Sequence, residues 1–141
     1  MTRPEHNSPY ENLRVLLLED NPQDAELIQN ELKKAEFVFT LLVVDTQKAY
    51  IEALDDFCPD IILSDYDLPS FTGAEVLQIK KLRCPDIPFI LVTGAVGEER
   101  AIEILKGGAT DYVLKNNLTR LIPAFWRALH ESYERRKRKQ A

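Results

Sequence analysis

The sequence predicts an α/β fold in which helices cover both faces of a parallel β-sheet. Five short apolar runs recur along its 141 residues, at 14–18, 39–44, 60–64, 88–92 and 111–114. Runs that are apolar on both faces are typical of strands buried in a parallel sheet. The segments between them place apolar residues three or four positions apart, which is helical spacing. This strict alternation predicts one domain of five βα units with right-handed crossovers.

The first two connecting segments begin with residues that are typical of helix starts. Asn21 and Pro22 suit the N-cap and first position of one helix, and Thr46 suits the N-cap of the next. We expect their inward faces to consist of Ala25, Ile28, Leu32 and Ala35, and of Ala49, Ala53, Leu54 and Phe57, respectively.

The last three helices are bounded by similar signals. Thr72 or Gly73 begins the third, 98–106 forms the fourth, and Thr119 begins a long fifth. Cys84-Pro85 ends the third helix and Gly107-Gly108 ends the fourth. We expect inward faces of Val76, Leu77, Lys80 and Leu82, then Ala101, Ile102 and Leu105, then Ile122, Phe125 and Leu129. Trp126 is expected on the exposed side of the fifth helix, as a candidate contact for a partner.

Composition limits the class of protein. The apolar fraction of 45% suffices for an ordinary core, and the net charge of −5 argues against non-specific binding of nucleic acid, although basic residues crowd 135–139. No run is apolar enough for a signal peptide or a membrane span, so a cytoplasmic protein is expected. Cys58 and Cys84 lack metal-ligand spacing and are interpreted as reduced, buried or half-buried thiols. His6 and His130 are expected to be solvated.

Polar residues follow four of the five expected strands. They are Glu19 and Asp20 after the first, Asp65 after the third, Thr93 at the fourth and Lys115 after the fifth. In parallel sheets of this kind, functional groups gather at the carboxyl ends of the strands where the strand order reverses. We therefore expect these side chains to meet in one shallow cleft.

Three carboxylates in such a cleft need a cation. At separations of about 4 to 6 Å they repel by roughly 1 to 4 kcal/mol per pair. Oxygen ligands with room for a carbonyl and waters favour Mg²⁺ over zinc. We expect Lys115 to pair with Asp65 at rest and later with a phosphoryl oxygen, rather than to neutralise the whole cluster.

Four segments at these strand ends carry a family resemblance: LLLEDNP, SDYDLPSFTG, LVTG and GATDYVLK. In this order they resemble the receiver domain of two-component response regulators, from about Leu13 to Leu129. The resemblance implies a flavodoxin-like (βα)5 doubly wound sheet with strand order 2-1-3-4-5. It divides the chain into a flexible N-terminal segment at 1–12, a receiver domain at 13–130 and a basic helical extension at 131–141.

The resemblance also implies a role for each acidic residue. Asp65 would be the phosphoacceptor, whose carboxylate attacks phosphorus to form an acyl phosphate. Asp65 and the acidic pair Glu19 and Asp20 would hold Mg²⁺, with Asp20 as a direct ligand and Glu19 acting through water. Asp67 would add its backbone carbonyl to the metal site.

Thr93 and Lys115 match the hydroxyl and the lysine that grip the phosphoryl oxygens and, with Asp65, make up the reacting group. Thr93 and Tyr112 match the residues through which the family responds to phosphorylation: the resemblance implies that the Tyr112 ring turns inward as Thr93 moves towards the phosphoryl group. The chain departs from the usual pattern after the lysine, where Asn116-Asn117 replaces the usual proline. We expect a trans bond there, because a cis bond without proline costs about 3 kcal/mol.

The implied function is a phosphorylation switch with self-catalysed, Mg²⁺-dependent phosphoryl transfer and slow dephosphorylation. The donor would be a sensor histidine kinase or a histidine phosphotransfer protein. The output would be altered binding of a downstream protein or linked domain, or a homodimer, along the fourth helix, fifth strand and fifth helix. No output domain follows in this sequence, which suits a stand-alone receiver, a phosphorelay intermediate or a fragment.

Two other functions compete with this interpretation. A phosphatase of the haloacid dehalogenase type also uses an Asp-x-Asp nucleophile, but that family places the nucleophile on its first strand and the acidic pair last. A receiver-like binding module that is never phosphorylated normally lacks the Asp or the Lys, and both are present here.

Overall fold

A computed structural model describes residues 10–94 and 97–140 and has the predicted five-stranded parallel sheet, in the order β2-β1-β3-β4-β5. The strands are β1 (Leu13–Leu18), β2 (Phe39–Val44), β3 (Ile61–Ser64), β4 (Phe89–Thr93) and β5 (Asp111–Leu114). The helices are α1 (Pro22–Lys33), α2 (Gln47–Asp56), α3 (Gly73–Arg83), α4 (Gly97–Lys106), the short 3₁₀ helix η2 (Lys115–Arg120) and α5 (Leu121–Gln140). The predicted fold class and strand order are confirmed.

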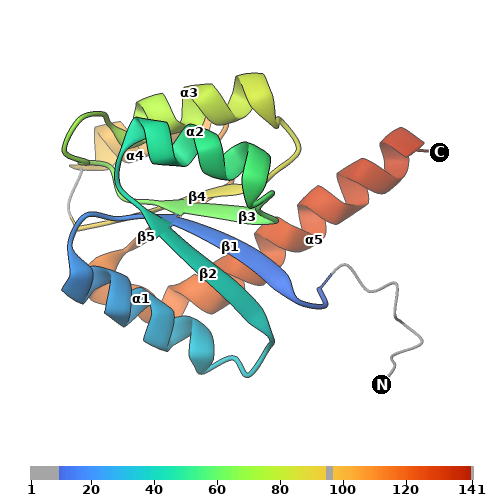
Figure 1. The fold of residues 1–141 in the computed structure, drawn as a ribbon, viewed down its shortest axis with the longest axis horizontal. Helices are drawn as coiled ribbons and strands as arrows, with labels where there is room; N and C mark the ends of the chain where they lie inside the picture. The colour runs from blue at the N-terminus through green and yellow to red at the C-terminus, as the bar shows by residue number, and fades with distance from the viewer. Residues whose placement is uncertain (1–9, 95–96, 141) are drawn as a thin grey trace.

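The sheet is sandwiched between two helical layers (Figure 1). Helices α1 and α5 cover one face, and α2, α3 and α4 cover the other. Alternate residues of β1 pack in the two cores, because successive strand residues point to opposite faces. Leu17 packs on the α1 and α5 side, and Leu16 and Leu18 pack on the other side. The central strands are therefore buried on both faces and hold their carboxyl ends in fixed positions.

Side-chain caps set where the helices begin. The Oδ1 atom of Asn21 accepts hydrogen bonds from the backbone N–H groups of Gln23 and Asp24, so α1 begins at Pro22. Thr46 caps α2 through the N–H of Ala49. These caps satisfy donors that the first turn leaves without a helical partner.

Helix α3 begins with a capping box. The Thr72 hydroxyl accepts from the N–H of Glu75, and the Glu75 carboxylate accepts from the N–H of Thr72. Thr72 is thus the N-cap and Gly73 the first helical residue.

The predicted burial of several side chains is wrong. Leu82 is 85% exposed and Ile102 is 46% exposed, because the inward faces of α3 and α4 run through Val76, Leu77 and Lys80 and through Ala101 and Ile104. Strand β2 lies at an edge of the sheet and exposes Thr40 and Val43.

Two residues of α2 and its C-terminal corner also differ from expectation. Tyr50, absent from the predicted stripe, is fully buried and donates its hydroxyl to the carbonyl of Val76, 2.9 Å away. Cys58 is exposed at a corner where its φ is +53°, whereas Cys84 is half-buried.

The C-terminal part of the chain begins with η2, so α5 starts at Leu121 and not at Thr119. Trp126 does not lie on the exposed side of α5 as predicted. It is half-buried, in edge contact with the rings of Tyr10, Phe37 and Phe125. The later turns of α5 extend beyond the sheet (Figure 1) and carry the basic residues.

Other expectations concern single groups. No peptide bond in the described parts of the chain is cis, so the bond after Lys115 is trans as predicted. His130 is exposed, and His6 lies outside the described residues. Within those residues, no helix has both the length and the apolar character needed to cross a membrane.

Gly73 is buried where α3 approaches the end of β3. A Cβ atom there would lie 2.9 Å from the carbonyl oxygen of Asp65, 3.0 Å from Cα of Tyr66 and 3.1 Å from a methyl carbon of Leu91. Two of these neighbours are backbone atoms, so the chain itself would have to shift. Gly73 does more than start a helix: it allows the backbone at Asp65 to pack directly under α3.

We expect Gly73→Ala to destabilise the fold by about 1 to 3 kcal/mol, the usual cost of overpacking a closed site. Chemical denaturation measures the change. Gly94→Ala is the matched control, because a Cβ atom at Gly94 meets nothing within 4 Å. Equal stability of the two variants would contradict the proposed role of Gly73.

Candidate functional site

Strands β1 and β3 bring two of the predicted acidic sites side by side. The N–H of Asp65 donates to the carbonyl of Leu18, 2.9 Å away, which continues the sheet ladder one residue past β3. Glu19 and Asp20 follow Leu18 directly. Glu19 and Asp65 are both buried, at 3% and 8% exposure. Two carboxyl groups are thus held against the end of the core.

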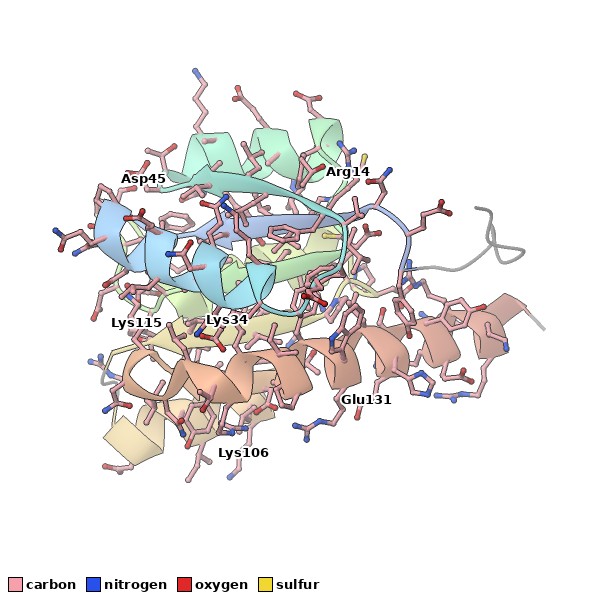
Figure 2. All side chains as sticks on the ribbon, turned by 90° about the horizontal axis from the view of Figure 1, so that it is seen from below. Arg14, Lys34, Asp45, Lys106, Lys115 and Glu131 are labelled. Carbon is pink, nitrogen blue, oxygen red and sulfur yellow. The ribbon has the colours of Figure 1, made fainter. Side chains whose placement is uncertain are left out.

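The ammonium group of Lys115 lies among three carboxylates, one of which belongs to the first turn of α1. Lys115 is labelled in Figure 2. It donates hydrogen bonds to Oδ2 of Asp65, 3.0 Å away, and to Oδ2 of Asp24, 2.8 Å away. It also forms an ion pair with Oε1 of Glu19 at 2.8 Å. The expected contact with Asp65 is present, but Lys115 neutralises more of the cluster than the sequence suggested.

Asp24 was not predicted to belong to the site. It lies in the first turn of α1, and its carboxylate comes within 2.8 Å of Lys115 across 91 positions of sequence. The signal was present, since an acidic residue at the start of a helix four positions after Asp20 faces the same end of the sheet. An acidic residue in a first turn is also common for helix-dipole reasons, so the signal was weak.

Burial and charge act in opposite directions on the two deepest groups. Burial raises the pKa of Glu19 above its ordinary value, although the ammonium of Lys115 lowers it in part. Burial alone would lower the pKa of Lys115, but the carboxylates of Asp24, Glu19 and Asp65 outweigh it and raise the pKa. Lys115 therefore keeps its positive charge, and the ionised form of Glu19 lowers the free energy of unfolding.

Three carboxylates are placed where they could share a metal ion. Oxygen atoms of Glu19, Asp20 and Asp65 all lie within 4.8 Å of one another. Oε1 of Glu19 is buried, and its partner is the Lys115 ammonium, 2.8 Å away. Three carboxylates at this spacing form an all-oxygen set, which fits a hard divalent cation such as Mg²⁺.

The other predicted site residues lie around this cluster. Asp67 is exposed, in a bridge with Thr72, and its carboxylate does not belong to the three that could share a metal. Thr93, 3% exposed, ends β4 opposite Leu114, the residue before Lys115. Tyr112 is half-buried in β5 and packs against the core on the α2, α3 and α4 side.

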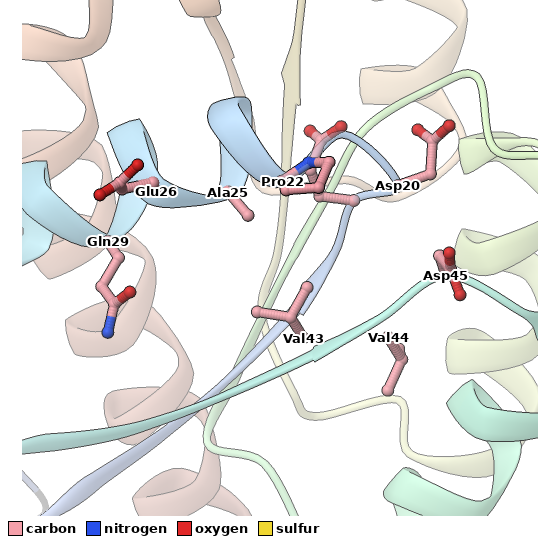
Figure 3. Close-up of a pocket in the computed structure, with 9 residues that line it drawn as sticks. Asp20, Pro22, Ala25, Glu26, Gln29, Val43, Val44 and Asp45 are labelled. Carbon is pink, nitrogen blue, oxygen red and sulfur yellow. The ribbon is translucent and has the colours of Figure 1, made fainter.

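An open hollow of about 570 Å³ borders the cluster between α1 and β2 (Figure 3). Asp20 and Asp45 lie at one end of it, and Glu26 and Gln29 at the other. Glu19 also contributes to its wall, whereas Asp65 and Lys115 do not. The acidic side of the site thus faces solvent through an acidic hollow.

Comparison with known proteins decides the family. Residues 15–125 match the response regulator receiver domain. The chain belongs to the response regulator receiver family. The site geometry agrees with that membership, and the phosphatase alternative is not favoured.

Similar proteins include longer regulators and single receiver domains. The luminescence regulatory protein LuxO of Vibrio campbellii is 37% identical over 73 residues, which is 52% of this chain and 16% of that protein. The receiver domain of a LuxO repressor protein from Vibrio parahaemolyticus has a TM-score of 0.76 at 26% identity, covering 88% of this chain and 95% of that one. The Mn²⁺-bound form of response regulator Rcp1 has a TM-score of 0.65 at 26% identity, covering 72% and 80%.

Removing the ammonium should destabilise this receiver domain. In metal-free buffer we expect Lys115→Ala to lower the free energy of unfolding by about 2 to 4 kcal/mol, because partly buried carboxylates lose their cation. Excess Mg²⁺ should recover part of the loss, since it binds only the folded site. Denaturant titration with and without Mg²⁺ measures both effects.

The matched control is Lys34→Ala, which removes an exposed lysine paired with Glu31 on α1. Because the Lys34 side chain is 71% exposed, we expect this pair to contribute roughly 0 to 1 kcal/mol. If Lys115→Ala lowered the free energy of unfolding no more than Lys34→Ala does, the cluster would not depend on the ammonium.

The raised pKa of Glu19 predicts a pH dependence. An acid whose pKa is raised by folding carries a cost when ionised, which is present above the folded pKa and absent below the unfolded value near 4.5. Metal-free Glu19→Gln should therefore be more stable than the wild type at pH 7, with the difference shrinking as the pH falls towards 4.5. Thermal unfolding over this range measures it.

Glu52→Gln is the control for this comparison, because Glu52 is exposed on α2. A Glu19→Gln variant that is less stable than wild type at pH 7 would contradict the assigned cost.

Proposed function

We propose that this receiver domain is a signalling switch that accepts a phosphoryl group on Asp65 from a phosphohistidine. The observation that supports it most is the buried Asp65 carboxylate, held by Lys115 and grouped with Glu19 and Asp20 at metal-sharing distance. A carboxylate so placed is accessible at its outer edge, yet it cannot turn away from an incoming group.

In the transfer step, a carboxylate oxygen of Asp65 forms a bond to phosphorus as the bond between phosphorus and the imidazole nitrogen breaks. The electron pair of that bond stays on the imidazole, which takes up a proton from solvent. The product on this chain is an acyl phosphate. A bound Mg²⁺, held by Glu19, Asp20, Asp65 and the Asp67 carbonyl, would neutralise charge on the phosphoryl oxygens.

This chain's own groups position the phosphoryl oxygens. Lys115 supplies a charged donor next to Asp65, and the hydroxyl of Thr93 lies at the end of the neighbouring strand. The response regulator Rcp1, a relative of 26% identity, has an Mn²⁺-bound form, which supports the assignment of a divalent cation to this receiver domain. We propose, from the family resemblance, that dephosphorylation is slow.

We propose that phosphorylation shifts Thr93 and Tyr112 and so changes the surface formed by α4, β5 and α5. Tyr112 lies in β5, one residue from Asp111, which pairs with Arg120 and Arg127. A shift of the Tyr112 ring would disturb packing beside these ion pairs. A downstream protein, a linked domain or a second copy of the chain would then bind this altered face.

The phosphodonor would be a sensor histidine kinase or a histidine phosphotransfer protein, and we place the exchange in the cytoplasm. The match covers only 16% of the LuxO relative, so the activity of that whole protein is not transferred here. The basic residues at 131–141 are proposed to form an extension beyond the receiver domain of 13–130.

Intact mass after incubation with Mg²⁺ and acetyl phosphate tests the function. We expect the wild type to gain one phosphoryl group and Asp65→Asn to gain none. Asp67→Asn is the matched control, because it removes the neighbouring carboxylate but leaves the backbone carbonyl in place. It should still be phosphorylated.

A wild type that gains no phosphoryl group, or an Asp65→Asn variant that gains one equally fast, would contradict the proposal. Steady turnover of small phosphate esters would instead support a phosphatase. Binding of a partner that is insensitive to Asp65→Asn would support a binding module that is never phosphorylated.

A further inference from the structure

Asp24 takes part in the cluster without belonging to the carboxylates that could share a cation. Its Oδ2 atom accepts a hydrogen bond from Lys115 at 2.8 Å, shorter than the 3.0 Å bond from Lys115 to Asp65. Within the described residues, the group placed to hold a metal comprises Glu19, Asp20 and Asp65. Of the three carboxylates that contact Lys115, Asp24 is therefore the one that lies outside the group placed to hold a metal.

The position of Asp24 is fixed by the start of α1. Its backbone N–H donates to Oδ1 of Asn21, 3.1 Å away, and the helix continues beyond it to Lys33, for about two and a half turns. A carboxylate in the first turn is favoured by the helix dipole. The side chain is about one-third exposed, while Lys115 is 18% exposed. The first turn of α1 thus holds a carboxylate oxygen of Asp24 in contact with Lys115.

The backbone that carries Lys115 has less local restraint. No proline follows Lys115, so φ of residue 116 is not fixed by a ring. The segment continues as η2, in which Asn117 departs from helical geometry at φ −143° and ψ 55°. The fixed point of the Lys115 side chain is its ammonium, which is held by the contacts with Glu19, Asp24 and Asp65.

Resting on the function proposed above, we propose that Asp24 is a positioning residue that holds the Lys115 ammonium beside Asp65 when a divalent cation occupies the site. Glu19 and Asp65 then share their oxygens with the cation, which weakens their hold on Lys115. Asp24 gives the ammonium a partner outside the metal site. Lys115 stays close to Asp65, with a proton free for a phosphoryl oxygen.

Loss of Asp24 has two consequences. Lys115 keeps only partners that are also metal ligands, so the ammonium and the cation compete for the same oxygens of Glu19 and Asp65. The ammonium is also less well oriented for phosphoryl transfer. Both metal affinity and transfer rate should fall together.

The test compares Asp24→Ala and Asp24→Asn with the control Glu26→Ala. Glu26 is exposed on the same helix, so its variant removes the same charge without a contact to Lys115. Magnesium affinity of the unphosphorylated protein is measured by calorimetry, and hydrogen exchange of the Lys115 ammonium by ¹⁵N NMR in metal-free buffer. The rate of phosphorylation by acetyl phosphate is measured by intact mass.

We expect Asp24→Ala to weaken Mg²⁺ binding and to slow phosphorylation, each by about tenfold relative to Glu26→Ala, the size of one charge-assisted hydrogen bond. The ammonium protons of Lys115 should exchange faster. Asp24→Asn, which is nearly isosteric and keeps an acceptor oxygen, should give smaller changes in the same direction. Because Asp24→Asn leaves the first turn of α1 intact, it also serves if the alanine variant folds poorly.

Metal affinity and phosphorylation rate equal to those of Glu26→Ala, or higher, would overturn the proposal, since the contact with Asp24 would then not help Lys115 to act beside Asp65. Failure of the proposed function is a separate result. A wild type that gains no phosphoryl group would refute Asp65 as phosphoacceptor, whereas metal affinity and ammonium exchange would still decide whether Asp24 positions Lys115.

Discussion

The ammonium of Lys115 joins carboxylates from three separate places in the fold. Glu19 follows β1, Asp24 lies in the first turn of α1, and Asp65 follows β3, while Lys115 itself follows β5. Like charges at this edge would otherwise push these elements apart by roughly 1 kcal/mol or more per pair. The arrangement of the site therefore depends on a cation at its centre, which links the groups that follow β1, β3 and β5.

The rest of the fold keeps this cluster rigid. β1 and β3 are buried between two helical layers, so the carboxyl groups of Glu19 and Asp65 have little freedom to turn towards water. Gly73 allows α3 to pack on the carbonyl of Asp65, and the Asn21 cap fixes the turn that carries Asp24. A metal or phosphoryl group entering such a site meets ligands that are already placed, which reduces the free energy lost to reorganisation.

The sequence predicted the parallel sheet and the residues at its carboxyl edge, because strand burial and strand ends leave strong linear patterns. The strand order was predicted from the family resemblance. The sequence did not predict Asp24, whose contact with Lys115 depends on how the first turn of α1 is rotated towards η2. The inward faces of α3 and α4 were partly wrong for the same reason: Leu82 and Ile102 are apolar, but rotation about the helix axis places them outside. Trp126 was misplaced because its neighbours Tyr10 and Phe37 come from distant segments.

In the function we propose, the unfavourable burial of charge in the unphosphorylated site contributes to the energy that drives the switch. Burial raises the pKa of Glu19, so the ionised cluster is under strain that one ammonium only partly relieves. A divalent cation and then a phosphoryl group each change the partners of Lys115. Moving a two-state equilibrium from 1:99 to 99:1 requires about 5.5 kcal/mol of differential interaction. Several partly buried charges that exchange partners at once can supply an energy of that size, whereas an exposed pair worth roughly 0 to 1 kcal/mol could not. The burial of the cluster is thus what would make it effective as a switch.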